Sequence, residues 1–298
     1  RYCLGSKLET LLSEELSWRR SEINRLHITA ESSLTDGEDR IHTALNKSLT
    51  LLLYSHWEGY IKKCSLIYLQ YISDQKCNMA DLSINFKILA LRKSMKKLAN
   101  AHPKDGGKTV KLSSVLGYFS EYDEVVNGKY FIKTYYDDAD KYKNNSLINT
   151  ESNLNKNVFS SILENLGIKI HDYYLEELTP PFRSCLVGEE DKSLIAQVID
   201  QTLLKCRNHN AHGRENSEHA VLSFETLKYL KQITLVMMQQ FSDDILEYAT
   251  EKYYLEENKA NKEAYHVEVN QVLRQTIESI LVEYNSKLED LSIIEGNT

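Results

Sequence analysis

Apolar residues recur three or four positions apart over most of the chain, which is the spacing of one buried face on an α-helix. The clearest stretch is 38–73, where this spacing is shared by Ile41, Leu45, Leu49, Leu52, Leu53, Trp57, Tyr60, Ile61, Cys64 and Tyr68. A second stretch, 6–33, contains Leu8, Leu11, Leu12, Leu16, Ile23, Leu26 and Ile28 at similar intervals. The pattern predicts two long amphipathic helices, with Trp57 and Tyr60 in the core.

Further helices are predicted over 81–101, 155–166, 191–208, 218–257 and 261–291. Gly167 is expected to end the second of these, because glycine readily adopts the left-handed conformation that closes a helix. The region 110–150 is less regular: Asn127-Gly128 between apolar and aromatic residues suggests a small hairpin, and the polar tract 137–153 suggests a surface loop.

These elements predict an all-α fold, a helical bundle with long C-terminal helices and an irregular insertion. We expect a helical domain over 1–245, with the insertion around 102–190. Residues 246–298 are expected to form a C-terminal helical extension that packs on the same domain.

The composition is that of a soluble globular protein, with 298 residues, three prolines and 11 glycines, and the low proline content favours long helices. No apolar run approaches the ~20 residues of a membrane span. The five cysteines are widely spaced and lack a C-x-x-C pair, which predicts free thiols and a cytoplasmic location. The net charge of −7 argues against a general nucleic-acid binder, but residues 91–111 carry seven Lys/Arg against the single acid Asp105.

The most polar motif lies at 205–215, KCRNHNAHGRE, directly after the apolar run LIAQVIDQTLLK. Arg207 and His212 are five positions apart and would project roughly 140° apart on an unbroken helix. They can converge if the helix ends within Ala211-His212-Gly213. An arginine fork and a titratable imidazole held together make a plausible phosphoryl-transfer pair. The alternative is a polar helix C-terminus, where cationic side chains suit the helix dipole.

The order Arg207-Asn208-x-x-Ala211-His212-Gly213 resembles the R-x4-H motif of the HEPN superfamily, in its RNxxAHG form. Three other stretches resemble the bacterial branch found beside restriction and toxin–antitoxin genes: YSHWEGYIKKC (54–64), TESNLNKNVFSSILENLGI (150–168) and the VIDQTLLK that leads into the motif. The resemblance covers roughly residues 40–245.

This resemblance implies a homodimer in which two motifs face one another across a shared cleft and cut RNA without a metal or other cofactor. The ribose 2′-hydroxyl would be the nucleophile, so the protein need supply only proton transfer and charge stabilisation. His212 would then be the acid/base, Arg207 would stabilise the transition state, and Asn208 would hold the motif. The implied setting is a toxin or antiphage defence system, with an antitoxin or defence-system protein as a further partner and no membrane. The alternative is a catalytically silent HEPN module that binds RNA or a partner protein as a regulatory subunit.

Some HEPN toxins carry a tyrosine two positions after the motif histidine, where a partner nucleotidyltransferase modifies it. Arg214 stands there in this chain, so the sequence does not support that route of neutralisation. His209 inside the motif is interpreted as an exposed bystander.

Secondary candidates surround the motif. Glu58 and Asp200 are possible supporting acids for Arg207 or His212, and either would equally suit an ordinary helix surface. The basic run contributes candidate RNA-binding residues: Arg92, Lys93, Lys96 and Lys97.

Two other kinds of chemistry are disfavoured. The cluster of His209, His212, Glu215 and His219 lacks the spacing of established zinc sites, so we expect no metal. A Cys206–His212 nucleophilic pair is also disfavoured, because Cys206 shares an apolar face with Ile195, Val198, Ile199 and Thr202.

Overall fold

The computed structural model describes residues 2–35, 39–99, 112–130, 148–150, 153–178, 192–211 and 221–295. Its elements are α1 (Tyr2–Thr35), α2 (Asp39–Asp74), η1 (Met79–Asp81), α3 (Ile84–Ala99), α4 (Leu112–Val126), α5 (Lys156–Leu166), α6 (Asp172–Leu175), η2 (Ala196–Leu204), α7 (Lys205–Ala211), α8 (Phe224–Thr250), η4 (Lys259–Asn261) and α9 (Lys262–Glu295). Within the described ranges there is no β-strand, and pairing of extended backbone is limited to isolated bridges. The predicted all-α class is confirmed.

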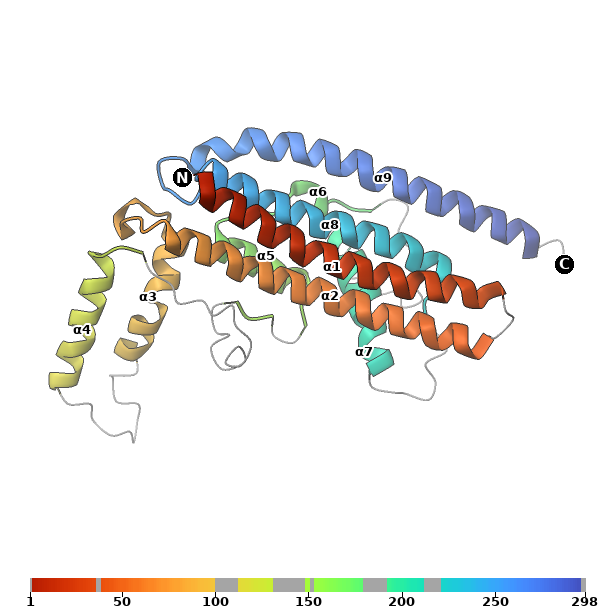
Figure 1. Cartoon of the computed structure of the whole chain (residues 1–298), viewed down its shortest axis with the longest axis horizontal. Coiled ribbons are helices and arrows are strands. Elements are labelled where there is room, and N and C mark those ends of the chain that lie inside the picture. Colours follow the sequence, from red (N-terminus) through yellow and green to blue (C-terminus); the bar gives the residue numbers. More distant parts are fainter. Residues whose placement is uncertain are drawn as a thin grey trace.

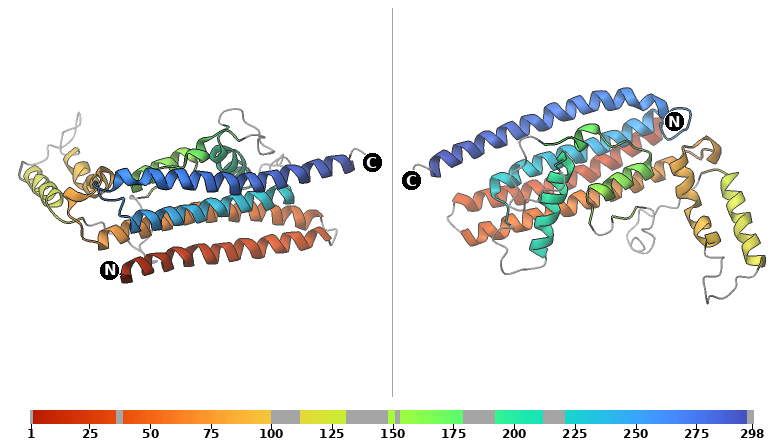
Figure 2. Two further views of the ribbon diagram at one scale, coloured as in Figure 1. Left: turned by 90° about the horizontal axis from the view of Figure 1, so that it is seen from above. Right: turned by 180° about the vertical axis from the view of Figure 1, so that it is seen from behind.

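Three long helices, α1, α2 and α8, run side by side, and α9 lies along α8 (Figures 1 and 2). α8 is continuous across residues 245 and 246, where the sequence suggests a boundary between the main domain and its extension. None of the helices in the described ranges is both long and apolar enough to cross a membrane.

The core of the bundle follows the predicted apolar stripes. Trp57 and Tyr60 are completely buried on α2, which confirms their prediction as core residues. Ile28 and Ile41 were predicted to share the buried faces, and this is wrong: their side chains are 60% and 50% exposed. The buried face of α1 continues instead through Ile23, His27 and Ala30, and that of α2 begins at Asn46 and Leu49, so Ile28 and Ile41 lie off these faces.

At the opposite end of α2, α3 and α4 project from the bundle as a pair (Figure 1). The hairpin suggested around Asn127-Gly128 is not formed, because α4 continues to Val126 and occupies its first arm. The apolar residues of this helix, such as Leu112, Val115 and Phe119, recur at helical intervals. After the turn the chain instead returns to the end of α2, where the Tyr130 amide donates to the Cys77 carbonyl at 2.7 Å.

The described part of the expected insertion belongs to the same core. α5 begins at Asn155, whose side chain accepts a hydrogen bond from the Val158 amide at 2.9 Å, and ends at Gly167 with φ 69°. The predicted helix over 155–166 and its glycine stop are therefore confirmed. On the inner face of α5, the Phe159 ring packs 5.2 Å from Trp57 and 6.1 Å from Phe241, measured between centroids. α5 is thereby held against both α2 and α8.

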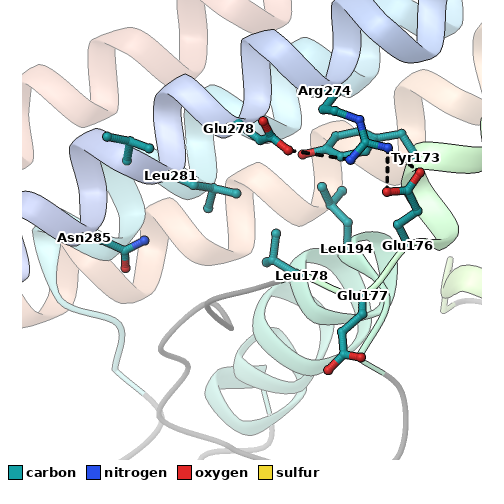
Figure 3. Close-up of a pocket in the computed structure, with 10 residues that line it drawn as sticks. Tyr173, Glu176, Glu177, Leu178, Leu194, Arg274, Glu278, Leu281 and Asn285 are labelled. Atoms are coloured by element: carbon teal, nitrogen blue, oxygen red, sulfur yellow. Dashed lines mark hydrogen bonds and ion pairs between the residues drawn. The ribbon is translucent and has the colours of Figure 1, made fainter.

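The C-terminal helix α9 packs against α8 and the segment around α6. A hollow of about 340 Å³ lies between α9 and residues 173–178, and Figure 3 shows its lining. Within it, Arg274 on α9 contacts both carboxylate oxygens of Glu176, at 2.5 and 2.6 Å, and lies over the Tyr173 ring. This ion pair, in which one guanidinium nitrogen contacts both oxygens, links α9 to the α6 segment.

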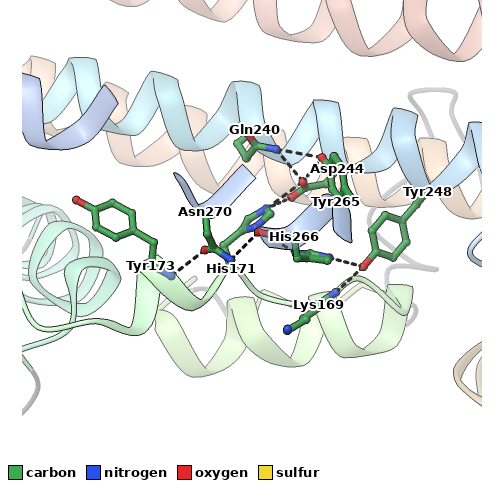
Figure 4. A network of polar contacts seen from close by, with 9 residues as sticks. All are labelled: Lys169, His171, Tyr173, Gln240, Asp244, Tyr248, Tyr265, His266 and Asn270. Carbon is green, nitrogen blue, oxygen red and sulfur yellow. Dashed lines mark hydrogen bonds and ion pairs between the residues drawn. The ribbon is translucent and has the colours of Figure 1, made fainter. Parts of the chain in front are cut away.

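A chain of buried polar groups also joins α8, α9 and the segment before α6 (Figure 4). The Nε2 of His171 lies 2.9 Å from the Asp244 carboxylate, and the two Nδ1 atoms of His171 and His266 lie 3.2 Å apart. His266 Nε2 contacts the Tyr248 hydroxyl at 2.8 Å. Burial, followed by the nearby His171, lowers the pKa of His266 to about 4. His266 is therefore neutral at pH 7 and links His171 to Tyr248 without adding a buried charge.

Candidate functional site

The chain enters the motif through η2, a π-helix in which hydrogen bonds span five residues. The Lys205 amide donates to the Asp200 carbonyl, and the Thr202 hydroxyl donates to the Gln197 carbonyl at 2.7 Å. α7 then continues the helix to Ala211.

The apolar face predicted for this helix is buried as expected: Ile195, Val198, Ile199, Thr202 and Cys206 are each at most 1% exposed. The burial of Cys206 agrees with our argument against a nucleophilic role for this thiol. The polar residues that follow, beginning with Arg207, lie at the partly exposed end of the helix.

Arg207 is held by uncharged groups. Its Nη1 donates to the Asn208 side-chain oxygen at 2.7 Å and to the Asn153 side-chain oxygen at 3.4 Å. Its guanidinium carbon lies 4.9 Å from the centre of the Tyr54 ring. Among the described residues, no carboxylate lies within ion-pair distance of this guanidinium. The positive charge is oriented by its neighbours but not neutralised by them, which suits an anionic ligand.

Tyr54 is the residue that the sequence interpretation overlooked. Its ring lies beneath Arg207, and its hydroxyl accepts a hydrogen bond from the Leu154 amide at 2.6 Å. Burial, followed by the charge of Glu58, raises the pKa of Tyr54 to about 12, so its hydroxyl stays protonated. Tyr54 and Glu58 are four apart on α2, and this spacing on one helix face was the available signal.

The two candidate supporting acids, Glu58 and Asp200, lie close to the motif but interact with different residues near Arg207. Glu58 acts on the site through Tyr54, because its charge contributes to the raised pKa of that phenol. Asp200 accepts a hydrogen bond from the Lys156 amide at 2.8 Å and so satisfies a backbone donor at the start of α5. Since Asn153 lies three residues before Lys156, Asp200 and Arg207 both contact the same short segment. Asp200 therefore supports the surroundings of Arg207.

The remaining residues of the motif divide between described and undescribed parts. Asn208 lies beside Arg207, as its expected role in holding the motif requires, and His209 is partly exposed. His212, Gly213 and Arg214 lie outside the described residues. Glu215 and His219, the other members of the cluster that was weighed as a zinc site, also lie outside them.

The basic run on α3 does not form a uniform cationic face. Lys97 forms an ion pair with Glu121 of α4 and lies over the Tyr118 ring. Arg92 is exposed and lines a hollow beside α5. The side chains of Lys93 and Lys96 are not among those described.

The helical bundle and the motif at the end of α7 define an HEPN module. More specifically, residues 8–254 match the family model of MAE_28990-like HEPN proteins, and the chain belongs to this family. Comparison with curated proteins and with solved structures found no significant match. Family membership confirms the resemblance that the RNxxAHG motif indicated.

Proposed function

We propose that the protein is a metal-independent endoribonuclease in which Arg207 and His212 act on RNA at the end of α7. The observation that carries the proposal is that Arg207 is held in place but its charge is not neutralised. Its guanidinium is fixed by Tyr54, Asn153 and Asn208, and no described carboxylate neutralises it. A fixed, unneutralised arginine is suited to stabilise the negative charge that develops on a phosphoryl group.

In the proposed reaction the ribose 2′-hydroxyl attacks the adjacent phosphorus, and the 5′-oxygen of the next nucleotide leaves. His212 exchanges protons with these two oxygens, and Arg207 binds the non-bridging phosphate oxygens. Asn208 acts as a positioning residue for Arg207, because its side-chain oxygen accepts from Nη1 at 2.7 Å. The products would carry a 2′,3′-cyclic phosphate and a 5′-hydroxyl.

The test is incubation of the purified protein with RNA in EDTA, followed by analysis of the product ends. We expect cleavage to persist in the chelator, since no divalent ion is required to generate the nucleophile. DNA of the same sequence, and RNA with 2′-O-methyl groups, should remain intact. Cleavage of DNA, 5′-phosphate products or complete loss of activity in EDTA would each contradict the proposal.

Variants of the motif, purified in the same way, show whether the cleavage comes from this protein or from a contaminating nuclease. Arg207→Ala and His212→Ala should each lower single-turnover cleavage by about 10²-fold or more, with an unchanged circular dichroism spectrum. The double variant should be no slower than the slower single variant, because both residues stabilise one transition state. A folded protein that binds RNA but leaves it intact would support the alternative, a silent HEPN module.

The proposed setting is a cytoplasmic toxin or antiphage effector, in keeping with the class of HEPN proteins that the motif resembles. Expression of the wild type in a bacterial host should then arrest growth, and expression of His212→Ala should not.

A further inference from the structure

A second hollow lies on the same face of the molecule as the motif. Figure 2, on the right, shows α7, α5 and α3 following one another across this face. The hollow, of about 350 Å³, lies between α3 and α5 and is lined by Arg92, Asn149, Asn157, Val158, Ser161, Ile162 and Asn165. Its described lining contains one arginine, several amides and a hydroxyl, but no carboxylate.

The polar residues of this hollow form a track that begins near Arg207. Asn157, Ser161 and Asn165 are four apart on α5, so they share one face of that helix. The start of α5 lies next to the motif, because Asp200 contacts Lys156. Its end lies next to α3, because the Asn85 side chain donates to the Asn165 carbonyl at 3.0 Å. α5 therefore spans the distance from the motif to α3.

We propose that this track binds the sugar–phosphate backbone of the RNA strand beyond the nucleotide at the motif. The inference rests on the proposed function in taking RNA as the ligand. Arginine, asparagine and serine side chains are the groups that hold phosphate and sugar oxygens in nucleic-acid complexes. The described lining offers no aromatic ring on which a base could stack. The track therefore binds backbone rather than reading sequence.

The groups that the track offers are side chains, because two of the first amides of α5 are already hydrogen-bonded to side chains. The Asn155 side chain accepts from the Val158 amide, and Asp200 accepts from the Lys156 amide. Asn157 and Ser161 are exposed, and Asn165 is partly exposed. These side chains, with the guanidinium of Arg92, can reach a strand that lies along α5.

The test measures binding separately from cleavage. A fluorescent single-stranded 2′-O-methyl RNA, which cannot be cut through the 2′-oxygen, is titrated with protein at several salt concentrations, and anisotropy is recorded. Arg92→Gln should weaken binding several-fold and lower the slope of log affinity against log salt by about 0.7, the value for one phosphate contact on a single strand. Asn157→Asp should weaken binding further. An acid in the first turn suits the helix dipole, so this change should not unfold α5.

Matched controls carry the same changes elsewhere: Arg25→Gln on the exposed side of α1 and Gln275→Glu on α9. Both should bind the RNA as the wild type does. If Arg92→Gln and Asn157→Asp also bind within twofold of the wild type, or if the wild type binds no RNA at 50 mM salt, the track is not the binding site.

The cleavage assay keeps this inference separate from the proposed function. If the wild type cuts RNA and the track variants cut it equally well at subsaturating RNA, the proposal that the track binds RNA is wrong. The proposed ribonuclease activity is unaffected by that result. If the wild type binds the RNA through the track but never cuts it, the proposal for the track stands and the proposed ribonuclease activity is wrong.

Discussion

Tyr54 carries out two structural tasks that substitution can separate. Its ring supports the Arg207 guanidinium, and its hydroxyl accepts a hydrogen bond from the Leu154 amide. Tyr54→Phe keeps the ring but leaves the buried amide without its acceptor, so we expect a loss of about 1–3 kcal/mol in the free energy of unfolding. Cleavage by the folded variant should stay near that of the wild type.

Tyr54→Leu removes the aromatic face as well, and we expect RNA cleavage to fall roughly tenfold, since a cation–π contact is worth about 1–2 kcal/mol where it is partly desolvated. Urea unfolding and single-turnover cleavage measure the two effects, with Tyr118→Phe on α4 as the control for loss of a phenol. Equal cleavage by the leucine and phenylalanine variants would show that the ring does not position Arg207.

Among helical elements, the start of α5 depends on Asp200 from a different helix. Asp200→Ala removes the acceptor for the Lys156 amide and should destabilise the protein by about 1 kcal/mol, the usual cost of a lost cap. Asn153 should then be held less firmly, and cleavage should fall. Asp200→Asn separates the hydrogen-bonding role of Asp200 from the effect of its charge, because asparagine keeps an acceptor but has no charge. Near-wild-type cleavage by this variant supports a hydrogen-bonding role, whereas equal loss in both variants would indicate that the charge acts on Arg207.

The buried network between α8, α9 and the segment before α6 makes stability depend on pH. The pKa of His266 is about 4 in the folded protein, against 6.5 for an ordinary histidine. Between these values the unfolded chain binds a proton that the folded chain does not, so acidification from pH 6.5 to 4 favours unfolding. The contribution of this residue is about 3 kcal/mol, fully present above pH 6.5 and lost as the pH falls towards 4.

Urea unfolding at pH 7 and pH 4.5 measures this effect. His266→Gln should lower stability at pH 7, because its contacts with His171 and Tyr248 are altered, but it should lose less stability on acidification than the wild type. His209→Gln, at a partly exposed position, is the control and should retain the wild-type pH dependence. A wild-type pH dependence in His266→Gln would rule out this histidine as its source.

For the whole molecule, the proposed chemistry requires assembly. The shared-cleft arrangement implied by the HEPN resemblance needs a symmetric dimer with the helices of residues 191–213 near its axis. We expect sedimentation to give a dimer at micromolar concentration. Mixed dimers of wild type and His212→Ala should cleave less per wild-type subunit than the wild-type dimer does. A monomer with full activity would exclude the shared cleft.

The scale of the whole molecule also shows why the basic run could not be interpreted from charge alone. Seven cations in 91–111 suggest one face, yet Glu121 of α4 pairs with Lys97 while Arg92 lies towards α5. The cations are separated because α3 packs between two neighbours. Only the position of α4 and α5 around α3 decides which cations are exposed to a ligand.

Hydrophobic periodicity by itself determined the long helices and the burial of Trp57 and Tyr60, and a single glycine determined the end of α5 at Gly167. Periodicity describes how side chains are distributed about one helix axis, and this depends on neighbours within a few residues. The same local signal failed at Ile28 and Ile41, because whether an apolar face is covered depends on a second helix. The RNxxAHG motif was equally local, so the sequence also identified Arg207 and the HEPN family.

Tertiary structure alone decided what surrounds Arg207. Tyr54 and Leu154 are 100 positions apart, and Asn153 is 54 positions from Arg207, so no pattern within one segment relates them. Asp200 on η2 likewise meets the Lys156 amide at the start of α5, and these two residues are 44 positions apart. Contacts between elements depend on how the helices cross, and this cannot be predicted from periodicity along the chain.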